Sequence, residues 1–143
     1  MEKSFDQRVA EAKAEVPAVT PKQARERKAS DPNTLFIDPR DAADITSTGI
    51  IPGALNLRLN ELNEKADEDL LQTLASRSRP IITSCGAGPM GALARSRPII
   101  TSCGAGPMGA LAAHALKQRG FSNVSFIDGG TQGWLDAGFA TAR

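Results

Sequence analysis

Eighteen residues of this 143-residue chain occur twice in succession without one change, as RSRPIITSCGAGPMGALA at 77–94 and again at 95–112. Both copies encode an apolar strand, a cysteine, a glycine-rich loop and the start of a helix, so only one copy can occupy a given place in a fold. Repeats that build solenoids number three or more and form one supersecondary unit each. We therefore interpret residues 77–94 as a tandem duplicated insert, recent or engineered.

Composition predicts one globular domain over residues 1–143, with 1–17 as an N-terminal helical extension. Hydrophobic residues make up 41% of the chain and charged residues 23%, and the net charge of +1 gives no basis for binding nucleic acid or a membrane surface. No apolar run approaches the roughly 20 residues that span a bilayer. The charged N-terminus does not resemble a secretory signal, so we expect a cytoplasmic protein with free thiols.

Helix and strand patterns alternate along the chain. Helices are expected over 5–16, 21–28, 61–77 and 109–119, with a turn and a short helix in 129–138; strands are expected over 34–38, 54–57, 98–102 and 123–128. Thr20, Pro21 and Gln23 form a typical helix start, and Gly120 a typical helix end. Strands separated by helices predict a parallel α/β sheet with functional loops at the carboxyl ends of its strands.

The sequence SCGAGPMGALAAHALK contains the pattern that carries chemistry, because Cys103 ends an apolar strand and precedes a glycine-rich loop and a helix. Loop N–H groups and the positive end of a helix dipole can together hold an anion. A thiol in that setting is expected to ionise readily and to act as a nucleophile. The residues alone leave open the alternative of a buried, inert cysteine.

Four segments, in chain order, resemble the rhodanese-like family, in its single-domain bacterial type. They are TLFIDPRDAADI, GIIPGALNL, IITSCGAGPMGALAAHALKQRGFSNV and FIDGGTQGWLDAG, and the resemblance covers roughly residues 18–138. It implies a five-stranded parallel sheet flanked by helices. It also implies sulfurtransferase chemistry: a cysteine takes sulfur from a small anionic donor such as thiosulfate or 3-mercaptopyruvate, holds it as a persulfide and passes it to a thiophilic acceptor, with no metal or organic cofactor.

The resemblance assigns roles to individual residues. The catalytic nucleophile is expected to be the cysteine of the repeated block, and the residues that follow each copy favour Cys103, with Cys85 as its displaced duplicate. The expected substrate-binding residues are Gly104, Ala105, Gly106, Pro107, Met108, Gly109 and Arg40, and the expected structural residues are Asp38, Gly129, Gly130 and Trp134. For Arg40 a structural ion pair with Asp38 is the favoured alternative, and Trp134 is expected to be a packing residue.

Two departures from the family pattern leave other functions open: the residues of the cysteine loop, and the position before Pro52, where the histidine usual in the family is here Ile50 or Ile51. Loop positions that often carry Arg, Lys, Ser or Thr are here Gly104 and Met108, so backbone N–H groups would hold the donor alone. A catalytically weak or inactive binding module therefore remains an alternative, as does an engineered chain with a duplicated segment. Phosphatases of this fold need Cys-x5-Arg, because the arginine holds the phosphoryl group bidentately, and Gly91 and Gly109 stand at that position.

The residues that follow each cysteine predict which copy enters the sheet. After Cys103 a helix can continue for about three turns to Gly120, whereas the helix after Cys85 meets Pro98. Proline inside a helix clashes and breaks it. Lengthening a loop costs only on the order of 1 kcal/mol, so the second copy is expected in the sheet. His114, the single histidine, is expected to be a partly exposed helix residue and not a base or metal ligand.

Overall fold

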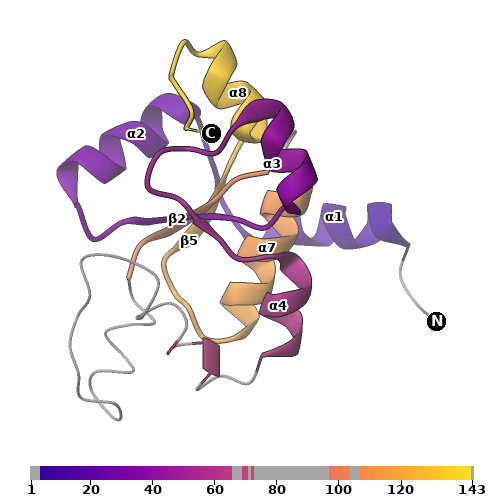
Figure 1. Ribbon diagram of the computed structural model, residues 1–143. Coiled ribbons are helices and arrows are strands. Elements are labelled where there is room, and N and C mark those ends of the chain that lie inside the picture. Colours follow the sequence, from indigo (N-terminus) through magenta and orange to yellow (C-terminus); the bar gives the residue numbers. More distant parts are fainter. Residues whose placement is uncertain (1–3, 66–68, 71, 73–96, 104–106, 143) are drawn as a thin grey trace.

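The computed structural model describes residues 4–65, 69–70, 72, 97–103 and 107–142. Helices and strands alternate along the chain (Figure 1). In order they are α1 (Phe5–Glu15), β1 (Ala18–Val19), α2 (Pro21–Ser30), β2 (Leu35–Asp38), α3 (Ala42–Thr48), β3 (Leu55–Asn56), α4 (Leu59–Glu64), β4 (Ile99–Thr101), α7 (Pro107–Gln118), β5 (Val124–Ile127) and α8 (Gly130–Asp136). Within these described segments, no helix combines the length and the apolar character that crossing a membrane requires.

The strands form one sheet in the order β1-β5-β4-β2-β3, and every neighbouring pair is parallel. This confirms the expected five-stranded parallel α/β fold. The central strand is β4, whose residue Ile99 pairs with Leu35 of β2 on one side and Val124 of β5 on the other. The carboxyl ends of β2, β4 and β5 therefore lie together at one edge of the sheet, where α/β proteins place their functional loops.

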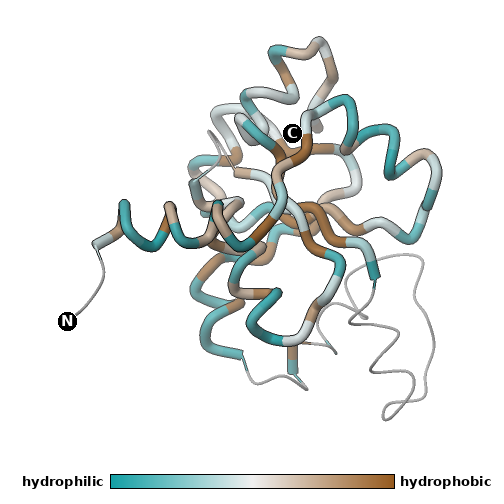
Figure 2. Tube along the Cα trace, turned by 180° about the vertical axis from the view of Figure 1, so that it is seen from behind, coloured by the Kyte–Doolittle hydropathy of each residue, from teal (hydrophilic) through white to brown (hydrophobic). Residues whose placement is uncertain are grey.

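Helices cover both faces of the sheet (Figure 1). One core lies between the sheet and α1, α4 and α7, and a second lies between the sheet and α2 and α8. Successive side chains of a strand point to opposite faces, so Leu35 and Ile37 enter the first core while Phe36 enters the second. Figure 2 shows hydrophobic residues concentrated along the strands, as expected of a sheet covered on both sides.

Local hydrogen bonds account for the helix ends that the sequence predicts. Ser4 and Gln7 form a capping box at the start of α1, and Thr20 and Gln23 form the same arrangement at the start of α2. At the end of α7, Gly120 adopts a positive φ of 94°. Its N–H and that of the next residue bond back to the last turn, which is the Schellman arrangement.

One expected helix is wrong in extent. A single helix over 61–77 was expected, but α4 ends at Glu64 and Lys65 has an extended backbone. At this end the Arg119 guanidinium, from just beyond α7, donates to the carbonyls of Leu62, Asn63 and Lys65, two of these bonds being 3.0 Å long. A cation at these carbonyls closes the carboxyl end of α4.

The described β4 and α7 both come from the second copy of the repeated block. Ile99–Thr101 form the strand, and α7 begins at Pro107, two residues before the expected start at Gly109, because proline suits the first turn of a helix. The helix then continues without interruption to Gln118. The first copy, residues 77–94, lies outside the described residues.

Candidate functional site

Cys103 lies at the carboxyl end of β4, in the middle of the sheet and just before α7. The residue is buried, with 3% of its surface exposed. Its carbonyl accepts a hydrogen bond of 2.5 Å from the backbone N–H of Thr131, at the start of α8. The predicted nucleophile is thus fixed at the edge of the sheet where the loops that follow β2, β4 and β5 meet.

The first turn of α7 packs directly against the end of β4. Thr101 donates from Oγ1 to the carbonyl of Gly109 at 2.5 Å, and a Cβ atom built on Gly109 would lie 3.5 Å from the backbone N of Cys103. Gly109 is buried, whereas Pro107 and Met108 are half-buried. The other predicted site residues, Cys85, Gly104, Ala105 and Gly106, lie outside the described residues.

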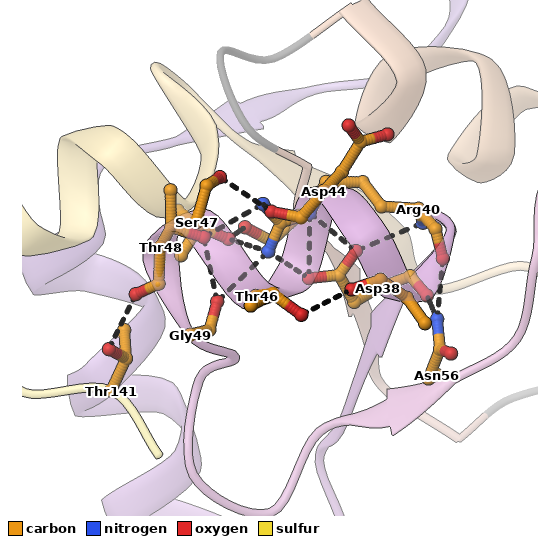
Figure 3. A network of polar contacts seen from close by, with 12 residues as sticks. Asp38, Arg40, Asp44, Thr46, Ser47, Thr48, Gly49, Asn56 and Thr141 are labelled. Atoms are coloured by element: carbon orange, nitrogen blue, oxygen red, sulfur yellow. Dashed lines mark hydrogen bonds and ion pairs between the residues drawn. The ribbon is translucent and has the colours of Figure 1, made fainter. Parts of the chain in front are cut away.

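Asp38 and Arg40 form a buried ion pair at the end of β2 (Figure 3). Arg40 Nε lies 2.9 Å and 3.1 Å from the two carboxylate oxygens of Asp38, and Nη2 lies 2.7 Å from Oδ2. The Asp38 carboxylate also accepts a bond from the Arg40 backbone N–H at 3.0 Å. This geometry is the bidentate arrangement that gives arginine–carboxylate pairs their strength.

The remaining donors of Arg40 hold the segment that follows β2 (Figure 3). Nη1 donates to Thr48 Oγ1 at 2.8 Å and to the Asp44 carbonyl at 3.2 Å, and Nη2 donates to the Gly49 carbonyl at 3.1 Å. All three guanidinium nitrogens therefore have partners within the chain. This geometry supports the structural alternative for Arg40 over a place at the mouth of a substrate pocket.

The residues of the carboxyl-terminal segment FIDGGTQGWLDAG form a turn and pack against the sheet. Gly129 adopts a left-handed conformation with φ of 78° at the start of α8, and Gly130 follows with φ of 62°. Trp134 is 6% exposed, donates from Nε1 to the carbonyl of Ala140 at 2.9 Å and meets Phe36 edge to face. Trp134 thus packs between β2 and the residues that follow α8.

His114 lies on the surface of α7 that faces α1 and α4. It is half-buried and borders a cavity of about 230 Å³ that Arg8 and Glu11 also line. Across the described part of the chain, no group of three or more His, Cys, Asp or Glu side chains is placed to hold a metal ion.

The sequence analysis missed two hydroxyl residues at the site, Ser102 and Thr131. Their side-chain oxygens lie 2.9 Å apart, and Arg40 Nη2 lies 3.4 Å from Thr131 Oγ1. Both residues are buried, with exposed fractions of 2% and 0%. Their positions in the sequence could have identified them, because Ser102 directly precedes Cys103 and Thr131 directly follows Gly129 and Gly130.

Comparison with known proteins decides the family. A family model described as the rhodanese-like domain matches residues 20–137. The chain belongs to the rhodanese-like family. The match includes three of the four segments on which the resemblance was based and the fourth up to Ala137, together with the described site residues. None of the curated proteins compared with this rhodanese-like chain matches it.

Solved structures share the rhodanese-like fold of this chain. A Rhodopseudomonas palustris protein of unknown function, described as a possible tyrosine phosphatase, aligns with a TM-score of 0.68 at 22% identity over 99% of this chain and 96% of its own. The polysulfide-sulfur transferase homodimer of Wolinella succinogenes aligns with 0.63 at 23% over 94% and 84%. A human single-domain sulfurtransferase aligns with 0.61 at 20% over 85% and 96%.

Proposed function

We propose that this protein is a sulfurtransferase or sulfur carrier that holds sulfane sulfur as a persulfide on Cys103. The observation that carries the proposal is the position of Cys103, between the end of the central strand at Thr101 and the start of α7 at Pro107, in a member of the rhodanese-like family. A helix N-terminus favours negative charge. Both the thiolate and the persulfide anion would gain from that location.

The proposed reaction has two displacement steps. The Cys103 thiolate attacks the outer sulfur of a donor such as thiosulfate, an S–S bond forms to Cys103, the S–S bond of the donor breaks and sulfite leaves with the electron pair. A thiophilic acceptor then attacks the outer sulfur of the persulfide, and the Cys103 thiolate leaves. With 3-mercaptopyruvate as donor the C–S bond breaks instead, and the enolate of pyruvate leaves with the electron pair and takes up the thiol proton to give pyruvate. No metal or organic cofactor takes part in either step.

The sulfur-loading experiment compares the two cysteines as matched variants. The protein is incubated with thiosulfate or 3-mercaptopyruvate, and its intact mass is measured under non-reducing conditions. We expect a gain of one sulfur atom in the wild type and in Cys85→Ser, and none in Cys103→Ser. Loading that persists in Cys103→Ser and disappears in Cys85→Ser would assign the reaction to the first copy and reject Cys103.

A binding module without catalysis is the second candidate, and the burial of Cys103 favours it. A side chain that is 3% exposed offers little surface to a donor, and Gly104 and Met108 contribute no side-chain donor to the loop. Calorimetric titration with thiosulfate distinguishes the two functions. Saturable binding without any mass gain on either cysteine supports the module, whereas a mass gain supports the sulfurtransferase.

We also propose a setting for this chemistry. A cytoplasmic location would keep the Cys103 thiol reduced, and the partners would be a small anionic sulfur donor and a thiophilic acceptor. The insert origin of residues 77–94 remains part of the proposal. It is supported by the identity of the two copies and by the origin of β4 in the second one.

A further inference from the structure

A line of buried polar side chains connects β2, α8 and the end of β4, next to the proposed nucleophile. It begins with the Asp38–Arg40 ion pair, passes from Arg40 Nη2 to Thr131 Oγ1 at 3.4 Å, and ends at Ser102 Oγ, 2.9 Å farther on. Each of the four residues is at most 3% exposed. In surroundings of low dielectric such contacts are strong, and an unpaired member is costly.

The chemistry of the members fixes one direction in this line. A guanidinium can only donate hydrogen bonds, so Thr131 Oγ1 accepts the 3.4 Å contact from Arg40. Between Thr131 Oγ1 and Ser102 Oγ either hydroxyl can be the donor, because a hydroxyl oxygen can accept two hydrogen bonds. The Thr131 hydroxyl thus links Arg40 to the residue that precedes the cysteine.

Thr131 also contacts the cysteine itself. Its backbone N–H donates to the Cys103 carbonyl at 2.5 Å. On the other side of β4, Thr101 holds Gly109 in the first turn of α7. The strand end is therefore fixed between two helices, and Thr131 supplies both a main-chain and a side-chain contact to it.

We propose that Thr131 is a positioning residue for the Cys103 thiol. Its backbone N–H bonds to the Cys103 carbonyl, and its hydroxyl links Ser102 to Arg40. This inference rests on the proposed function, in which the thiol must stay close to the N-terminus of α7. The field of a helix end falls off within about one turn, so a small displacement of Cys103 would move its sulfur out of that field and slow its reaction with an electrophile.

The experiment follows alkylation of Cys103 by iodoacetamide as a function of pH, in a Cys85→Ser background so that a single thiol reports. Thr131→Val removes the hydroxyl but keeps the shape and the backbone N–H, while Thr131→Ser restores the hydroxyl. Thr46→Val, at an exposed position of α3, is the matched control.

We expect Thr131→Val to slow alkylation near neutral pH by about two- to tenfold, the factor that one hydrogen bond contributes, and to leave the alkaline plateau unchanged. Thr131→Ser and Thr46→Val should match the wild-type profile. A wild-type pH profile in Thr131→Val overturns the proposal, even if that variant melts at a lower temperature, because a purely structural role predicts such a result.

Ser102→Ala provides a second route if Thr131→Val does not fold. It removes the other end of the same hydrogen bond, so it should shift the profile in the same direction, and an unshifted profile in this variant also overturns the proposal. Alkylation requires no sulfur transfer. A wild-type protein that never gains sulfur therefore rejects the proposed function, whereas an unshifted profile in a protein that does gain sulfur rejects only the role of Thr131.

Discussion

The Arg40 guanidinium contacts both carboxylate oxygens of Asp38, and the two side chains are only 3% and 2% exposed. Few surface ion pairs contribute measurably to stability, but a buried pair that loses one partner leaves an uncompensated charge. Because Arg40 also holds the Thr48 hydroxyl and the Gly49 carbonyl, the pair joins β2 to the segment that follows it.

Replacing Arg40 by leucine should destabilise the protein by about 3–5 kcal/mol, because Asp38 would remain buried without its cation. Arg58→Leu is the control, since Arg58 forms an exposed pair with Glu61 and is itself 49% exposed; its loss should cost at most about 1 kcal/mol. Urea unfolding followed by circular dichroism measures both. Equal unfolding midpoints for the two variants would contradict a structural role for Arg40.

Gly49→Ala should destabilise the protein by at least about 3 kcal/mol. Gly49 has a φ of 79°, and an added Cβ would lie 2.7 Å from the Ala142 carbonyl oxygen. Gly53→Ala separates backbone strain from overlap, because Gly53 has a φ of 82° but open space around it; we expect a loss of about 1–2 kcal/mol there. Thermal unfolding measures both variants. If Gly53→Ala loses as much stability as Gly49→Ala, steric overlap at Gly49 is ruled out as the cause of its loss.

Equivalent substitutions in the two copies test which copy forms the central strand. Ile100 is 1% exposed in β4, so Ile100→Asp should cost at least about 3 kcal/mol. Ile82→Asp makes the same change at the corresponding position of the first copy and should cost far less. Chemical denaturation of both variants decides the matter, and a greater loss in Ile82→Asp would mean that the first copy occupies the sheet.

Lys28 should give the protein a stability that rises with pH in the alkaline range. Burial lowers the pKa of Lys28, and the nearby Arg97 lowers it further. Between the lowered pKa and the ordinary value of about 10.4, the unfolded chain binds more protons than the folded chain, so the free energy of unfolding increases with pH. Lys28→Met should lose this increase.

The measurement is the stability difference between wild type and Lys28→Met, taken by urea unfolding from neutral pH upward. Lys22→Met, at an exposed position of the same helix, corrects for the loss of a lysine in general. The free energy of unfolding of the wild type minus that of Lys28→Met should increase as the pH rises. A difference that is constant with pH would show that the folded state does not disfavour the charged amine.

Sequence reasoning located the features of this fold that neighbouring residues determine. The capping boxes of Ser4 and Thr20 span four residues each, and Gly120 ends α7 through bonds to the turn that precedes it. The alternation of helix and strand along the chain also predicted the parallel sheet, because parallel strands need a crossover connection that a helix supplies. The position of Cys103 at a strand end also followed from local pattern, because an apolar strand, a glycine-rich loop and a helix succeed one another there.

Features that depend on distant residues were not predictable. Arg119 donates to the last carbonyls of α4 from more than fifty positions away, and no pattern within residues 61–77 predicts that contact. The bond from Thr131 to the Cys103 carbonyl joins α8 to the end of β4, which are close in space but far apart in the sequence. The strand Ala18–Val19 is two residues long, too short to show the alternation that marks a strand.

The pairing of β1 with β5 has a consequence for synthesis of the protein. In the described sheet β5 is the single neighbour of β1, and Val19 aligns with Ile127. A nascent chain therefore exposes Val19 without a strand partner until Ile127 has left the ribosomal exit tunnel. Completion of the sheet must wait for that moment, and ribosome-associated chaperones have the whole preceding interval in which to bind the unfinished domain.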